Sequence, residues 1–374
     1  MTTVDEFAAS FGEEPGYLDF ARVGPPGRTV KDDQYAQTGL LGRARFGTID
    51  SLDQEDARVR QAVAAVTGFS AEQVAFQPNT SVGLMHAMFG ITGGVAMSLA
   101  EFPSMTFAAV RSAEALGVLT PIWLETDHGR VTPGNIRDQL VPGIAAVSVS
   151  LVDFRTGYLV DLEGIRQVIG DRLLIVDAIQ GFGVVDAPFE VADVVVSGGQ
   201  KWVRAGWGTG FLALSERAIE ELTPVFSGFS GTEDESMPLD EVTPPLRGAG
   251  AFSISNPDPI AQSRFAAALE EIADVGVQQI NARIAEKVSR LIDLADEYAI
   301  PVVSPRNEAE RAGIVVLEPP ADQLTVLTAS LFNHGVTTTT REGRVRLSAH
   351  VSTDEETFDM LRASFVGFAS AIRP

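Results

Sequence analysis

Short apolar segments alternate with helix-like segments over roughly the first 245 residues, and this alternation restricts the fold more than any other feature. Residues 145–151, 173–176 and 194–197 are dominated by valine, isoleucine, leucine and alanine. Strands of a parallel sheet are buried on both faces, so their sequences are continuous apolar runs and do not alternate between apolar and polar residues. The pattern therefore predicts an α/β protein with a mostly parallel, doubly wound sheet that is covered by helices on both sides.

The expected elements of this sheet can be placed by residue number. The expected strands are residues 74–76, 95–98, 119–123, 145–151, 173–176, 194–197 and 210–214, and the expected helices are residues 55–66, 81–89, 106–116 and 162–169.

The chain is also expected to form two domains, because 374 residues exceed what one ordinary core accommodates. Near residues 238–250 the composition shifts to proline, glycine and acidic residues. We predict an N-terminal arm (1–15), a large domain (16–245) and a small C-terminal α/β domain (246–374), against which the N-terminal segment can pack. The small domain is expected to contain helices at 261–298, 321–332 and 354–368 and strands at 301–303, 313–317 and 344–348.

The net charge and the cysteine content exclude several classes of partner and of site. Twenty-eight basic and 50 acidic residues give a formal net charge of −22, which disfavours nucleic acids and anionic membranes as partners. Because the protein as a whole is acidic, a site for an anion must be formed by basic side chains or backbone N–H groups inside a cleft. The chain has no cysteine, so we predict no disulfide, no zinc–thiolate site, no iron–sulfur cluster and no thiolate nucleophile. No metal site is expected. The first ten residues lack a signal-peptide pattern, so a cytoplasmic protein is expected.

Polar side chains follow several strands at the edge where a doubly wound sheet binds ligands. Asp177 and Gln180 follow strand 173–176, and Lys201 follows strand 194–197. A desolvated lysine loses its charge readily, and the neutral amine attacks aldehydes. Asp177 suits a protonated ring nitrogen, and the helix start at residues 79–81 suits a phosphate. An aldehyde, a ring nitrogen and a phosphate together describe pyridoxal 5′-phosphate (PLP).

The segments "LLIVDAIQGFGV" and "DVVVSGGQKWVRAGWGTGFLAL" resemble those of fold-type I PLP enzymes of the aminotransferase class V family. This family includes isopenicillin N epimerase-like proteins, kynureninases and cysteine desulfurases. The segments "YLDFARVGPPGRTV", "VDFRTGYLVDLEGI" and "GRVRLSAHVSTDEE" extend the resemblance over nearly the whole chain. It implies a seven-stranded, mostly parallel sheet with a smaller C-terminal domain.

The resemblance also implies roles for individual residues. Lys201 carries the cofactor as a Schiff base and moves the substrate α-proton. Asp177 pairs with the ring nitrogen, and Gln180 donates a hydrogen bond to the ring 3-oxygen. Thr80 and Ser81 give hydroxyl and backbone donors to the phosphate.

Four further positions complete the expected site. Phe102 stacks on the face of the ring. Gln200 stands where many relatives have histidine, and it can donate to the phosphate. Asn256 stands where relatives often reach the phosphate of the partner subunit. Arg346 binds the substrate α-carboxylate through its planar fork. His86 lies in an apolar helix and is expected in the core.

The sequence does not determine which of several PLP-dependent reactions the protein catalyses. We expect an aminotransferase acting on an amino acid, and β-elimination or C–S lysis, epimerisation and kynureninase-type cleavage are the competing reactions. A desulfurase that stores sulfur on a protein thiol is excluded because there is no cysteine. A dehydrogenase or nucleotide-binding protein needs a glycine fingerprint that the chain lacks. A non-catalytic relative is disfavoured by the intact Lys201 and Asp177. Relatives act as homodimers, so a homodimer is expected.

Overall fold

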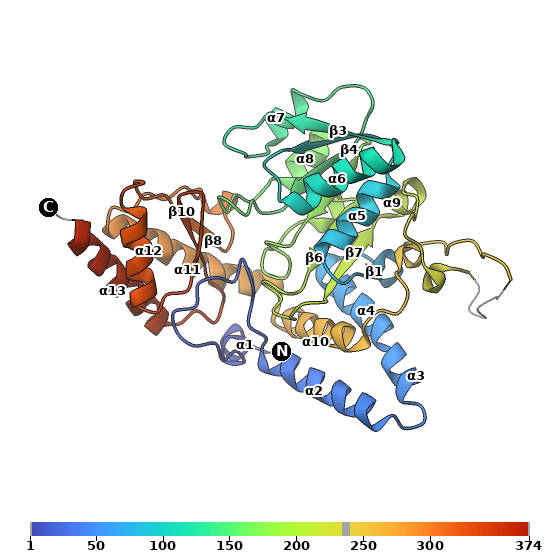
Figure 1. The fold of residues 1–374 in the computed structure, drawn as a ribbon, viewed down its shortest axis with the longest axis horizontal. Coiled ribbons are helices and arrows are strands. Elements are labelled where there is room, and N and C mark those ends of the chain that lie inside the picture. Colours follow the sequence, from blue (N-terminus) through green and yellow to red (C-terminus); the bar gives the residue numbers. More distant parts are fainter. Residues whose placement is uncertain (1, 234–239, 373–374) are drawn as a thin grey trace.

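The computed structural model describes residues 2–233 and 240–372. A seven-stranded sheet with the strand order β1-β7-β6-β5-β4-β2-β3 forms the larger part of the molecule (Figure 1). The strands are β1 (Val74–Phe76), β2 (Gly93–Ser98), β3 (Leu119–Leu124), β4 (Ile144–Ser150), β5 (Leu173–Asp177), β6 (Val194–Gly198) and β7 (Gly210–Leu214). From β3 to β6 neighbouring strands run parallel, whereas β7 is antiparallel to both β6 and β1. These observations confirm the predicted fold class.

Helices cover both faces of this sheet, because its strands carry apolar side chains on both faces. Val194 and Val196 of β6 face one hydrophobic cluster, and Val195 faces the other. The cluster with Val194 contains residues of α5 (Thr80–Gly90), α6 (Pro103–Leu116) and α9 (Glu216–Glu221). The cluster with Val195 contains residues of α4 (Glu55–Thr67), α8 (Leu162–Ile169) and α10 (Pro259–Val275).

A second, three-stranded antiparallel sheet has the order β8-β10-β9. Its strands are β8 (Ile314–Leu317), β9 (Thr339–Arg341) and β10 (Arg344–Ser348), and the helices α11 (Val277–Glu297), α12 (Leu324–Asn333) and α13 (Glu355–Ile372) lie beside it (Figure 1). The N-terminal segment reaches this sheet. Tyr17 bridges Thr337 and Asp19 bridges Ser348, while the Asp19 carboxylate accepts a hydrogen bond from Thr339 Oγ1 at 2.7 Å, 320 residues away.

Several expectations about single elements were wrong. The helical pattern over residues 261–298 forms two helices, α10 and α11, because Gly276 between them has a φ of +90°, a conformation that favours glycine. Residues 301–303 form no strand; Val302 makes one isolated bridge to Leu317.

Among the α-helices and strands of the described residues, six were not anticipated: α1 (Val4–Ala9), α2 (Arg28–Arg43), α3 (Thr48–Asp53), α7 (Pro133–Arg137), α9 and β9. Among the described residues, no helix combines the length and the apolar composition needed to cross a bilayer.

Candidate active site

Asp177 and Lys201 come together at the carboxyl end of two adjacent parallel strands. Asp177 is the last residue of β5 and pairs in register with Val196 of β6, and Lys201 follows the end of β6 by three residues. Burial lowers the pKa of the Lys201 ammonium to about 8, and the Asp177 charge opposes this shift. Burial raises the pKa of the Asp177 carboxyl to about 6, opposed by the Ile179 N–H and by Lys201. Burial therefore brings the pKa values of both groups closer to neutral pH than those of the free side chains, as is common at functional sites.

One oxygen of the Asp177 carboxylate is free to take a ligand. Its Oδ1 accepts a hydrogen bond from the Ile179 N–H at 3.1 Å. Its Oδ2 is buried and has no hydrogen-bond partner in the described part of the chain. A buried carboxylate oxygen without a donor is costly, so this oxygen fits a ligand that carries an N–H or O–H group.

An aromatic wall faces the lysine. Phe102 precedes the first residue of α6, and the Lys201 Nζ lies 5.6 Å from the centre of its ring. The Phe154 ring meets Phe102 edge to face, with 5.2 Å between the ring centres. A flat ring placed between Phe102 and Asp177 would have an apolar surface on one side and a carboxylate at its edge.

The start of α5 forms a polar cradle close to the lysine loop. Asn79 caps the helix and accepts a hydrogen bond from the Val82 N–H at 3.1 Å, while the Thr80 Oγ1 is buried with no partner among the described residues. The Ser81 Oγ shares a 2.7 Å hydrogen bond with the Ser104 Oγ. A Cβ on Gly198 would come within 3.2 Å of the Thr80 Oγ1 and would collide with the Gln200 side chain. The absence of a side chain at residue 198 keeps room for an anion at the helix N-terminus.

Gln180 links three segments around the lysine. Its Nε2 donates to the Ala21 carbonyl at 2.9 Å, and its Oε1 accepts from the indole N–H of Trp202 at 3.0 Å. The Gln200 carbonyl accepts a hydrogen bond from the Gly24 N–H at 2.8 Å. One amide hydrogen of Gln180 is left for a ligand, and the glutamine orients both the N-terminal segment and the residue next to Lys201.

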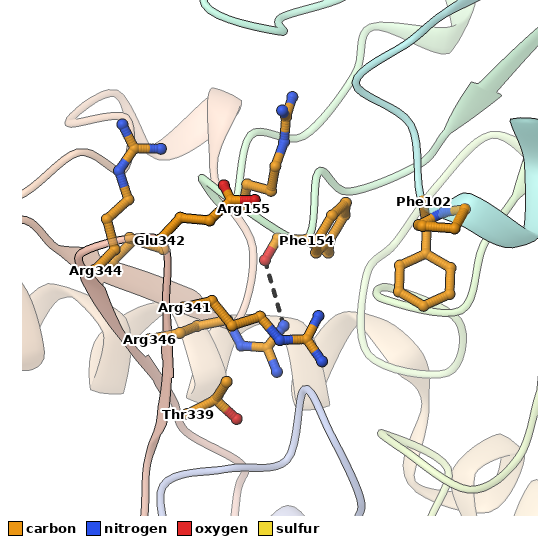
Figure 2. A pocket seen from close by; sticks show the side chains of 10 residues that line it. Phe102, Phe154, Arg155, Thr339, Arg341, Glu342, Arg344 and Arg346 are labelled. Atoms are coloured by element: carbon orange, nitrogen blue, oxygen red, sulfur yellow. Dashed lines mark hydrogen bonds between the residues drawn. The ribbon is translucent and has the colours of Figure 1, made fainter.

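Arg346 reaches this region from the small sheet. Its Nη1 donates to the Phe154 carbonyl at 3.3 Å (Figure 2). Its Nη2 lies 3.7 Å from the Asp19 carboxylate. Its Nε is buried without a partner in residues 2–233 and 240–372. Arg346 and the two phenylalanines line a cavity of about 280 Å³.

Eight of the nine predicted site residues thus lie around the lysine loop, and Asn256 is the exception. It is exposed in the loop before α10, and no hydrogen bond or ion pair joins it to the other predicted residues within the described chain.

Two residues were not anticipated. Glu101 accepts hydrogen bonds from the Ser150 N–H at 3.2 Å and from its Oγ at 2.5 Å, and Ser150 pairs in register with Asp177. Burial raises the pKa of the Glu101 carboxyl to about 7. The sequence feature that could have identified Glu101 is its position next to Phe102 in the segment "AEFPS". The other is Arg341, which lines the same cavity as Arg346.

Residues 43–371 match the family described as Aminotransferase class-V. The chain belongs to this family. Its members include fold-type I PLP enzymes, and the seven-stranded sheet with a small antiparallel C-terminal sheet is that fold. No curated protein sequence matches the chain significantly.

Solved structures of class-V proteins superpose on most of the chain. A cysteine desulfurase from Thermococcus onnurineus NA1 has a TM-score of 0.85 and 21% identity, covering 96% of this chain and 95% of its own. The cystine C–S lyase C-DES, in complex with its product cysteine persulfide, has a TM-score of 0.85 and 19% identity, with coverages of 94% and 97%. The cysteine desulfurase CsdA from Escherichia coli has a TM-score of 0.82 and 16% identity over 100% of both chains. Identities this low establish the fold alone.

Proposed function

We propose that this class-V protein is a PLP-dependent enzyme that acts on an amino acid, with Lys201 holding the cofactor, and that it is an aminotransferase. The observation that carries the proposal is the unpartnered Oδ2 of Asp177 beside a lysine whose pKa is lowered to about 8, at the ends of adjacent strands. Family membership supplies the cofactor class.

The residues present fit PLP at each of its polar groups. The free oxygen of Asp177 suits a protonated ring nitrogen, and the remaining amide hydrogen of Gln180 suits the ring 3-oxygen. The Thr80 hydroxyl, which has no partner among the described residues, and Ser81 lie at the start of α5, and the Gln200 side chain and Thr80 both lie close to Gly198, an arrangement that suits a phosphate. Phe102 offers its ring as the stacking surface.

Bound PLP supplies an aldehyde that condenses with amines and a ring that accepts the electron pair left at the substrate Cα. The chain supplies the rest. The Asp177 carboxylate keeps a proton on the ring nitrogen, which makes the ring a better electron acceptor. The Lys201 Nζ, with a pKa near neutrality, can take a proton from the substrate Cα and return it. Arg346 orients the substrate through its α-carboxylate.

A second candidate is a β-eliminating C–S lyase on the same cofactor. The cystine C–S lyase C-DES shows that this fold supports such a reaction. The chain has no cysteine, so such a reaction would release its sulfur product without a persulfide on this chain. Arg346 and Lys201 would keep the roles given above.

We also propose a homodimer in which Asn256 approaches the site of the partner subunit. The exposed position of Asn256 in one protomer is compatible with this role. Large apolar side chains are exposed elsewhere on the protomer, including Leu99, Phe107 and Trp207, which are 67%, 63% and 70% exposed. Light scattering should give twice the protomer mass, and an active monomer would contradict the proposal.

The cofactor assignment can be tested by borohydride reduction followed by peptide mapping. The chain has only three lysines, Lys31, Lys201 and Lys287, so each position can be read separately. We expect a pyridoxyl adduct on Lys201 alone and its loss in Lys201→Ala. Lys287→Ala is the matched control, because burial also lowers the pKa of that lysine. An adduct that is absent or lies on another lysine would refute the proposal.

A panel of amino acids then distinguishes the reactions. Transamination converts the cofactor to pyridoxamine phosphate and yields an oxo acid. Elimination yields pyruvate with ammonia and, from sulfur amino acids, a sulfur product. Epimerisation in deuterium oxide places deuterium at Cα with the cofactor unchanged. Formation of pyruvate without pyridoxamine phosphate would replace the aminotransferase assignment by the lyase.

A further inference from the structure

Three arginines share one face of the β9–β10 hairpin. Arg341 pairs in register with Arg344, and Arg346 lies two residues further along β10, opposite Thr339. Residues in register and residues two apart on a strand point to the same side of a sheet. Thr339 and all three arginines line the 280 Å³ cavity. Like charges at such close range are destabilising unless a counter-charge is present.

Two of the three arginines have a counter-charge. Arg344 forms an ion pair with Glu318 at 2.7 Å, and Arg346 lies 3.7 Å from Asp19. Arg341 has no ion pair or side-chain hydrogen bond within residues 2–233 and 240–372. Among the described residues that line the cavity, Glu342 is the only acidic one, and its carboxylate points away from the Arg341 guanidinium (Figure 2).

The Arg341 side chain is exposed to solvent, and it also lines the cavity. Figure 2 shows it next to the guanidinium of Arg346, with both directed toward Phe154 and Phe102. Its positive charge is felt at Arg346 and at Lys201, where it opposes protonation. In a chain of net charge −22, this wall of the cavity concentrates positive charge.

We infer that Arg341 binds a second anionic group, at the end of the substrate side chain, while Arg346 holds the α-carboxylate. The substrate class is then α-amino acids with an acidic side chain, whose terminal group is a carboxylate, a sulfinate or a phosphate. This inference rests on the proposed function, because it takes Lys201 to hold the cofactor and Arg346 to hold the α-carboxylate.

Binding of unreactive dicarboxylates tests the inference without any turnover. Succinate and glutarate have no amine, so their binding to the holoenzyme can be measured by calorimetry beside that of their monoamides, succinamate and glutaramate. We expect at least one dicarboxylate to bind about tenfold or more tightly than its monoamide, since a hydrogen-bonded charge pair contributes that much. In Arg341→Gln this preference should fall below about threefold.

Arg344→Gln is the matched control, because it removes the same charge from the same hairpin but from a residue already paired with Glu318. It should keep the tenfold preference. A ratio near one in the native enzyme, a preference that survives in Arg341→Gln, or an equal loss in Arg344→Gln would overturn the inference.

A second set of measurements, with amino acids, identifies the terminal group of the substrate side chain. Glutamate, cysteine sulfinate and O-phosphoserine are compared by kcat/KM with glutamine, and the acidic substrate preferred by the native enzyme should lose most of its advantage in Arg341→Gln. The two proposals fail differently. If borohydride labels Lys201 but dicarboxylates show no preference, the anion site is wrong. If dicarboxylates show the preference but Lys201 is not labelled, the cofactor assignment is wrong.

Discussion

Asp177 and Lys201 leave the same edge of the sheet from adjacent strands, and each charge opposes the effect of burial on the other. The carboxylate favours the ammonium form of the lysine, and the ammonium favours the ionised form of the carboxyl. The pKa values of about 6 for Asp177 and about 8 for Lys201 therefore each depend on the charge of the other residue.

Asp177→Asn should lower the pKa of Lys201, because it removes the negative charge that stabilises the ammonium. Only the neutral amine captures an aldehyde, so the rate at which the cofactor-free protein takes up PLP should rise with pH through about 8 in the native chain. In Asp177→Asn the midpoint should lie at lower pH. The rate is measured by the absorbance of the bound cofactor. Asp186→Asn, at an exposed carboxyl in the following loop, should leave the midpoint in place, and an unchanged midpoint in Asp177→Asn would contradict the coupling.

Trp202→Phe should destabilise the protein by about 1–3 kcal/mol, because it leaves the buried Oε1 of Gln180 without a donor. Urea unfolding measures the change in the free energy of unfolding. Trp207→Phe is the control, since Trp207 is 70% exposed, and it should change that free energy by less than about 0.5 kcal/mol. Equal effects of the two substitutions would show that the indole hydrogen bond contributes little.

Most of the large sheet could be predicted from the sequence because its strands are short and apolar on both faces. β5 and β6 were placed within one residue of their ends, and the polar residues that follow them were recognised for the same reason. The helix α2 was missed because it buries only Val30 among its 16 residues, so its apolar stripe is weak. The break at Gly276 was missed because glycine is also tolerated inside helices.

Arg341 was missed for a different reason. A charged residue on a short edge strand has no local pattern that separates a side chain that meets only solvent from one that also lines a cavity. Its direction depends on how the small sheet faces the lysine loop, which is a tertiary property. His86 shows the opposite case, because its apolar helix was sufficient to predict its burial, and it is 1% exposed.

His86 should make the protein sensitive to acid. Burial lowers its pKa to about 4, and neither ring nitrogen has a hydrogen-bond partner in the described structure. Between pH 6.5 and 4 the unfolded chain binds a proton that the folded protein does not, so the free energy of unfolding falls as the pH is lowered through this range, by roughly 3 kcal/mol in total.

His86→Leu should remove that component and reduce the loss of stability between pH 7 and pH 4.5. Urea unfolding at the two pH values measures it. His128→Leu, at a side chain that is 92% exposed, should keep the native pH dependence. If His86→Leu were as acid-sensitive as the native chain, other groups would account for the effect.

Glu13→Ala should destabilise the protein by about 3 kcal/mol or more, because it removes the counter-charge of a guanidinium that is fully buried. Arg204 pairs with Glu13, donates to the Pro25 carbonyl at 2.6 Å and lies 3.6 Å over the Phe11 ring. Glu14→Ala, at the exposed neighbouring position, should have little effect. Thermal unfolding compares the two variants, and matching melting temperatures would contradict the assigned role of Glu13.

The hydrogen bond between Thr339 and Asp19 joins residues that are 320 positions apart. A ribosome adding about 5–20 residues per second needs roughly a quarter of a minute to a minute to make the chain between them. Throughout that time Asp19 lacks the strand it finally joins. Nascent chains halted before Thr339 should therefore leave the start of the polypeptide open to proteases, and that protection should be acquired only when the last tenth of the protein has been synthesised.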